Sequence, residues 1–94
     1  VSDKTIFIPT AFSPNGDGNN DEFLIRGAEY TLDFNCRIYN RFGDIVFQTT
    51  DPTQAWDGTY KGKQLTNEVF VYYLELSFEE DEIINRKGTI TLIR

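Results

Sequence analysis

Apolar and polar residues alternate along several short segments of this 94-residue chain, and this period of two constrains its fold more than any other feature. In residues 33–39, Phe34, Cys36 and Ile38 occupy every second position. Because successive side chains of a strand point to opposite faces of a sheet, this pattern predicts a strand with one buried face. No segment shows a convincing helical period, so we expect an all-β fold.

A β-hairpin over residues 33–49 is the clearest local prediction. Gly43 can adopt the positive φ that closes a tight connection, and Ile45 and Phe47 continue the alternation beyond it. Arg41 is predicted to project from the tip of this hairpin. There it either pairs with one of the many carboxylates of the chain or docks a partner.

Further strands are expected on both sides of the hairpin. They are a first strand near residues 6–12 interrupted by Pro9, a short one at 23–25, the longest one at 68–78 and a last one at 88–94. In the longest strand, alternate residues are expected on opposite faces. One face carries Phe70, Tyr72, Leu74, Leu76 and Phe78, and the other carries Val69, Val71 and Tyr73. Because both faces carry apolar side chains, part of this strand is expected to be covered on both sides. About seven short strands separated by turn signals favour a two-sheet antiparallel β-sandwich.

Composition excludes several classes of function. The chain has 15 acidic and 9 basic side chains, which argues against nucleic acid and anionic lipid as partners. It has no His, so it cannot form a Ser–His or Cys–His pair, and Cys36 is expected to be a small core residue. No stretch approaches the roughly 20 apolar residues of a membrane span. A small sandwich filled with aromatic side chains leaves little room for a substrate pocket, so we predict no enzyme activity.

One loop carries a possible metal site. Oxygen-bearing side chains stand at every second position in Asn15, Asp17, Asn19 and Asp21, and they could converge on Ca²⁺. The helix–loop–helix calcium pattern fails, because it needs Gly where Asn20 stands. The alternative is a set of Asx turns in which these side chains bond their own backbone. No other cofactor is expected.

The segment around Trp56 has a structural interpretation. A Trp-Asp-Gly triplet occurs in propeller repeats, but it occurs once here and propellers need many copies. We expect Trp56 to close one end of the core and Asp57 to accept hydrogen bonds from turn amides.

Four segments together resemble one family. They are residues 12–21 (FSPNGDGNND), 38–47 (IYNRFGDIVF), 56–63 (WDGTYKGK) and 88–94 (GTITLIR). In this order they are similar to the gliding motility-associated C-terminal domain, which is the type B sorting domain of the type IX secretion system. The similarity extends from about Ile6 to Arg94.

The resemblance implies an immunoglobulin-like antiparallel sandwich that acts as a secretion signal. Residues 1–94 would be a single C-terminal sorting domain of a large adhesin-like protein from Bacteroidetes-type bacteria. The absence of Met at Val1 fits excision from a longer chain. Its partners would be the type IX secretion machinery and a PorP/SprF-type outer-membrane protein. The cargo would cross the outer membrane and reach the cell surface or the medium.

We expect the machinery to recognise the last strand, because a terminal strand at a sheet edge offers unpaired amides and carbonyls. Within that strand, Ile90 and Leu92 are expected on one face. The predicted surface consists of Arg41 together with Gly88, Thr89, Ile90, Thr91, Leu92, Ile93 and Arg94. The alternative function is a passive adhesion module that binds glycan or calcium through its Asn/Asp loop.

Overall fold

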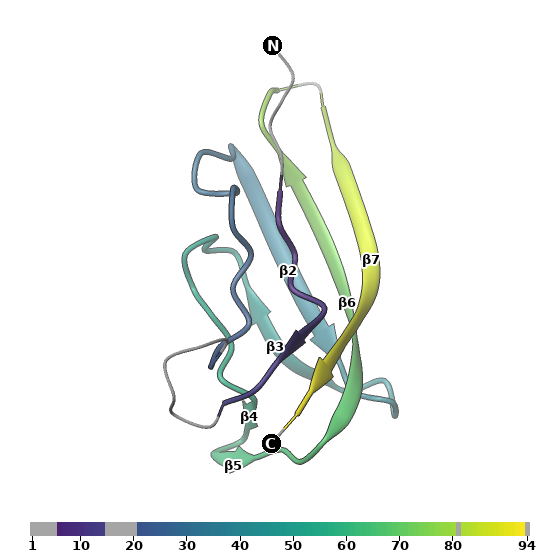
Figure 1. The fold of residues 1–94 in the computed structure, drawn as a ribbon. Helices are drawn as coiled ribbons and strands as arrows, with labels where there is room; N and C mark the ends of the chain where they lie inside the picture. Colours follow the sequence, from purple (N-terminus) through teal and green to yellow (C-terminus); the bar gives the residue numbers. More distant parts are fainter. Residues whose placement is uncertain (1–5, 15–20, 81, 94) are drawn as a thin grey trace.

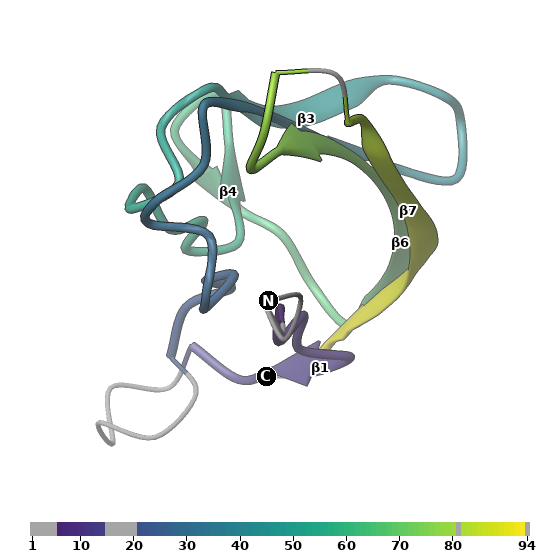
Figure 2. The same cartoon turned by 90° about the horizontal axis from the view of Figure 1, so that it is seen from above.

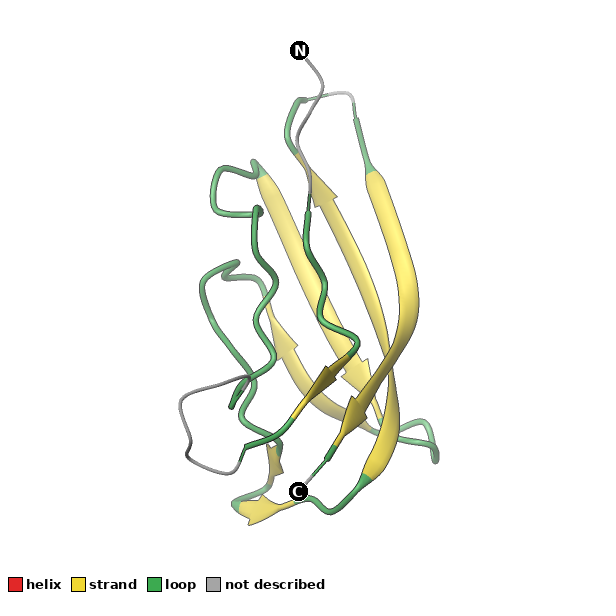
Figure 3. Ribbon diagram, viewed as in Figure 1, coloured by secondary structure: helices red, strands yellow, loops and turns green. Residues whose placement is uncertain are grey.

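The computed structural model describes residues 6–14, 21–80 and 82–93, and its regular secondary structure is all β (Figure 3). Two strands are long, β6 (Glu68–Ser77) and β7 (Ile84–Leu92). The predicted hairpin is confirmed as β2 (Asp33–Tyr39) and β3 (Ile45–Thr49). Three further strands have two residues each: β1 (Ala11–Phe12), β4 (Thr59–Tyr60) and β5 (Lys63–Gln64).

The main sheet has the strand order β1-β7-β6-β2-β3, and β4 and β5 form a separate small sheet (Figure 1). All pairs are antiparallel except one, because β1 runs parallel to β7 with Ala11 opposite Thr91 and Phe12 opposite Leu92. The predicted antiparallel arrangement is therefore confirmed for every pair of the described strands except β1–β7. Antiparallel neighbours are commonly joined by a short hairpin, whereas most of the chain lies between β1 and β7.

A second layer faces the main sheet and consists mostly of irregular chain (Figures 2 and 3). Two isolated bridges hold it together, one between Phe7 and Arg26 and one between Phe23 and Trp56. Their backbone N···O distances are 2.8–3.0 Å. The strand predicted at residues 6–12 is therefore observed as the two-residue β1 and the bridge at Phe7, and the strand predicted at 23–25 is observed as the bridge at Phe23. Pro9 contributes to this, because it has no N–H to donate to a ladder.

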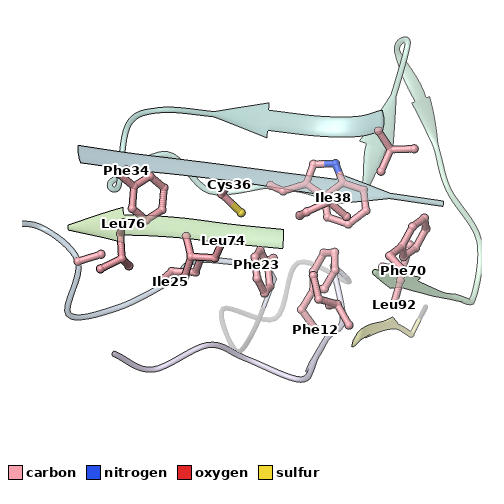
Figure 4. Close-up of a cluster of buried hydrophobic side chains, with 14 residues drawn as sticks. Phe12, Phe23, Ile25, Phe34, Cys36, Ile38, Phe70, Leu74, Leu76 and Leu92 are labelled. Atoms are coloured by element: carbon pink, nitrogen blue, oxygen red, sulfur yellow. The ribbon is translucent and has the colours of Figure 1, made fainter. Parts of the chain in front are cut away.

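The core lies between the two layers, and the architecture is an all-β sandwich (Figure 4). The side chains predicted to share the inner face of the sheet are buried at Phe34, Cys36, Ile38, Phe70, Leu74, Leu76, Ile90 and Leu92. Phe12, Phe23 and Ile25 are buried opposite them. Each large apolar side chain that is fully buried stabilises the fold by about 1.5–3 kcal/mol.

Trp56 is buried in this core, in line with its predicted structural role. It is 2% exposed, and its ring lies 5.1 Å from that of Phe70 and 5.4 Å from that of Phe12. Its indole N–H donates to the backbone carbonyl of Thr59 at 2.9 Å. Asp57 accepts from the backbone N–H of Thr59 at 3.1 Å and from its hydroxyl at 2.7 Å. The predicted hydrogen bond from a turn amide to Asp57 is confirmed, and Trp56 is a buried core residue.

The last strand differs from its prediction at both ends. It begins at Ile84 rather than Gly88, and it ends at Leu92. Asn85, Arg86 and Lys87 are all exposed, so this part of the strand shows no apolar alternation. No helix that could cross a membrane occurs among the residues that the structure describes.

Candidate partner-recognition surface

Arg41 lies in the turn between β2 and β3, where Asn40 organises the backbone. The Asn40 side-chain oxygen accepts from the backbone N–H of Phe42 at 2.9 Å and from that of Asp44 at 3.0 Å. Gly43 has the predicted positive φ of 86° and donates its N–H to the Asn40 carbonyl at 3.1 Å. The turn is therefore a well-bonded platform that presents Arg41 and Phe42.

Both side chains at this tip are exposed. Phe42 is 75% exposed, and the Arg41 guanidinium carbon lies 5.0 Å from the centre of its ring. Exposed cation–π pairs contribute about 0.5–1 kcal/mol. Arg41 and Phe42 thus form a small aromatic and cationic surface that a partner could contact.

The predicted terminal segment lies in β7 and just beyond it. Ile90 and Leu92 are fully buried, while Thr89 and Ile93 are exposed, as the alternation predicts. Gly88 lies beneath the ring of Tyr72. Arg94 is outside the described residues. Of the predicted surface, Ile90 and Leu92 belong to the core, so their side chains are not accessible to a partner.

The backbone of β7 is not an open edge along its whole length. Near its end, Thr91 donates to the Thr10 carbonyl at 2.9 Å and Ile93 donates to the Phe12 carbonyl at 3.0 Å. The expectation that the terminal residues offer unpaired amides is therefore wrong for Thr91 and Ile93. The short β1 covers this end and leaves the preceding part of β7, residues 85–89, as the outer strand of the sheet (Figure 1).

Arg41 and the terminal strand do not form one continuous site. The strand β6 lies between β7 and β2, the strand that leads into the Arg41 turn. Figure 2 shows that turn and the end of β7 on different sides of the molecule. They are two separate candidate surfaces.

The proposed calcium loop lies mostly outside the described residues, which exclude Asn15, Asp17 and Asn19. Asp21 is described and is half-buried. In the described part of the chain, no group of three or more His, Cys, Asp or Glu side chains gathers as metal ligands would. Calcium binding by this loop stays a prediction.

Cys36 is a core residue, as predicted. Its side chain is 2% exposed, and burial raises the pKa of the thiol from its ordinary 9.0 to about 12. A thiol must ionise to act as a nucleophile, so Cys36 is unreactive near neutral pH in the folded domain.

Sequence reasoning missed one surface on the outer face of the main sheet. Arg37, Tyr73 and Lys87 lie directly opposite one another on three adjacent strands. The Lys87 ammonium nitrogen lies 5.3 Å from the centre of the Tyr73 ring, and the Tyr39 ring packs edge-on against that ring at 5.4 Å. Arg37, Tyr73 and Lys87 border a surface depression of about 430 Å³. Lys87 was not included in the predicted surface, because the last strand was predicted to start one residue later, at Gly88.

This outer face is open to solvent. Val69 is 51% exposed and Tyr73 is 45% exposed, so the expected covering of β6 on both sides is not present in the described structure. Alternation correctly separated these residues from the inner face, but it could not show which face would be covered.

Comparison with known proteins gives one finding. A family model described as the CHU_C type IX secretion signal domain matches residues 6–92. This range contains every strand of the structure. No match was found among curated proteins or among solved structures.

Proposed function

Because this chain belongs to the CHU_C family of type IX secretion signal domains, we propose that the secretion machinery reads it as a folded surface and exports a large adhesin-like cargo with it. As a signal of this family, the domain interacts with the type IX secretion machinery and directs export toward the outer membrane or cell surface. The observation that carries the proposal is the family match over the whole described fold.

The proposal extends to a specific partner and destination. We infer that a PorP/SprF-type outer-membrane protein receives the domain and that the cargo stays at the cell surface. Support comes from the resemblance of four segments to type B sorting domains and from the exposed tip of the β2–β3 turn. A rigid hairpin tip with a cation and an exposed aromatic ring is the kind of group that is enriched in protein interfaces.

The function is tested by a fusion. Residues 1–94 are joined to the carboxyl end of a periplasmic reporter in a bacterium that has a type IX system. We expect the reporter to reach the surface or medium, and to stay in the periplasm when the domain, the translocon or the PorP/SprF-type protein is deleted. Equal export with and without the domain would contradict the signal function, and export without the PorP/SprF-type protein would contradict the named partner.

The role of Arg41 is separable in the same assay. We expect Arg41→Ala to reduce export while lowering the melting temperature by only a few degrees, since its exposed cation–π contact with Phe42 contributes about 0.5–1 kcal/mol. Lys63→Ala, at an exposed position of β5, is the matched control and should export normally. Normal export of Arg41→Ala would remove this side chain from the recognition surface.

We also propose that the domain has no catalytic activity. The chain has no His, and its single thiol is buried with a pKa of about 12. Glycan or calcium binding remains the alternative role of the Asn/Asp loop, and it is compatible with a sorting function.

A further inference from the structure

We propose that the outer edge of β7 at residues 85–89 binds an acidic, extended segment of the secretion partner as an additional strand. This region is called the β7 edge below. The proposal rests on the function proposed above and adds to it where the partner docks and what chemistry that partner carries.

Alternate backbone groups along the β7 edge point away from β6. The N–H groups of Thr91 and Ile93 point away from β6, because they donate to Thr10 and Phe12. Backbone groups alternate in direction along an antiparallel ladder, and the pairing of β7 with β6 runs without a register shift. The N–H and C=O groups of Asn85, Lys87 and Thr89 therefore point outward as well.

Most of the outward backbone groups of the β7 edge have no backbone partner among the described residues. In the described chain, β1 begins at Ala11 opposite Thr91 and does not reach Thr89. One outward carbonyl, that of Asn85, accepts from the Arg86 guanidinium at 3.1 Å. The described residues give no backbone partner to the outward groups of Lys87 and Thr89. Figure 1 shows this part of β7 at the margin of the sheet.

The β7 edge carries positive charge on a domain that is negative overall. The chain has a net charge of −6, but β7 contains Arg86 and Lys87 and no acidic residue. Lys87 lies opposite Tyr73 on the outer face, and Arg86 lies opposite the inward-facing Leu74. The two cations therefore stand on opposite faces of the same edge. Alternate side chains of a strand added at this edge would lie beside Lys87 on the outer face and beside Arg86 on the inner face. Because opposite charges on adjacent strands attract, acidic side chains at these positions would stabilise the pairing.

These charges also disfavour a second copy of this domain as the occupant. If the whole β7 edge paired antiparallel with itself, the pairing would centre on Lys87 and place two ammonium groups opposite each other. Two domains of charge −6 also repel each other over longer distances. An acidic segment of a different protein avoids the contact between two ammonium groups and places carboxylates beside Lys87 and Arg86 instead, so local attraction at the edge opposes the longer-range repulsion by the domain.

The experiment uses the reporter fusion with two variants of the β7 edge. Thr89→Pro removes one outward N–H, and proline is tolerated on edge strands. Lys87→Glu inverts a charge and leaves the backbone intact. The matched controls are Gln48→Pro, on the edge strand at the other side of the sheet, and Lys63→Glu, which makes the same charge change on β5.

We expect both β7 variants to lower the exported fraction by about tenfold or more, because each removes a hydrogen bond or charge pair from a partly desolvated interface. Both controls should export like the wild type. Thermal unfolding of each purified domain, including Thr89→Pro, should show a melting temperature within about 5 °C of the wild type.

The outcomes separate this proposal from the one on which it rests. If the wild-type fusion is not exported, the signal function is wrong and the docking proposal falls with it. If the wild type and Lys87→Glu are exported equally, the acidic partner is wrong although the signal function stands. Should Thr89→Pro fail to fold, Lys87→Glu and its control decide alone. A dimer in sedimentation that Thr89→Pro weakens would assign the edge to a second copy instead.

Discussion

The ring of Tyr72 on β6 lies across the backbone of Gly88, its direct partner on β7. A methyl group at position 88 would lie 2.8 Å from both Cε2 and the hydroxyl oxygen of Tyr72. The same ring lies 6.4 Å from that of Phe23 in the facing layer. Tyr72 therefore covers the glycine and connects the two layers beside the β7 edge.

Gly88→Ala should consequently destabilise the domain. The added methyl group forces the Tyr72 ring away from Gly88 and from Phe23, and we expect a loss of about 1–3 kcal/mol, as for other overpacked sites. Chemical denaturation of the two purified domains measures this loss.

A double-mutant cycle gives the control for this prediction. With Tyr72→Ala in the background, the clash is gone and Ala is a better strand residue than Gly, so Gly88→Ala should become neutral or slightly stabilising. An equal loss in both backgrounds would show that the cost does not come from the Tyr72 ring.

Asn40→Ala should loosen the β2–β3 turn. The substitution leaves the N–H groups of Phe42 and Asp44 without their side-chain acceptor, and we expect a loss of about 1 kcal/mol in the free energy of unfolding. Gln48→Ala, at an exposed position of the adjoining strand β3, serves as the control and should cost less than half as much. Equal losses for the two variants would contradict the bonding role of Asn40.

Lys61→Asn should stabilise the domain once the Tyr60 ring is removed. Lys61 and Gly62 connect β4 to β5 with φ values of 53° and 79°, and Lys61 is the non-glycine residue with a positive φ in the described chain. Lys61→Asn also removes the cation–π contact of the Lys61 ammonium with the Tyr60 ring at 5.2 Å, so the comparison is made in a Tyr60→Leu background. Asn tolerates the positive φ better, and in that background we expect a gain of about 0.5 kcal/mol. The control Lys63→Asn, on β5 itself, should not stabilise. A lower melting temperature for Lys61→Asn in the Tyr60→Leu background would contradict the strain at this position.

Cys36 should make stability depend on pH in the alkaline range. Burial raises the thiol pKa from 9.0 to about 12, so the folded state holds its proton more tightly than the unfolded state does. The corresponding stability is fully present below pH 9 and is lost as pH rises from 9 towards 12. Urea denaturation from pH 7 to 11 measures the decline.

Cys36→Ala provides the reference for that titration. It lacks the thiol, so its stability should decline less steeply above pH 9 although it starts lower because of the lost volume. Parallel curves for the two proteins would attribute the alkaline loss to other groups, such as the tyrosines. In the folded wild type, a thiol reagent at pH 8 should react only as fast as the domain opens.

Calcium tests the Asn/Asp loop. If Asn15, Asp17, Asn19 and Asp21 hold the ion, millimolar calcium should raise the melting temperature, because a ligand of the native state stabilises it. Asp17→Ala should abolish that rise, and magnesium should produce a smaller one. An unchanged melting temperature in calcium would contradict calcium binding by these residues and would favour the alternative that their side chains form Asx turns.

The alternation of apolar and polar residues predicted the longer strands of the main sheet. The β2–β3 hairpin, the positive φ of Gly43 and the buried faces of β6 and β7 all follow from local sequence, because one-sided burial leaves a period of two in the residues. The match to secretion signal domains likewise agrees with the four segments that suggested the family.

The second layer could not be predicted in the same way. Phe23 and Trp56 meet in a single bridge, and such a contact leaves no periodic signal in either segment. The parallel pairing of Ala11 with Thr91 depends on how the chain crosses between layers. The open part of β7 was missed because Asn85 and Lys87 lie at an edge, where polar residues are tolerated on both faces.

The pairing of β1 with the end of β7 has a consequence for how the domain folds. It joins residue 11 to residue 91, so it closes a loop of nearly the whole chain, and such contacts form late because of their entropic cost. Until residues 91–93 have left the ribosome, Thr10 and Phe12 have no ladder partner on that side. The sandwich therefore reaches its finished state only after β7 has been synthesised.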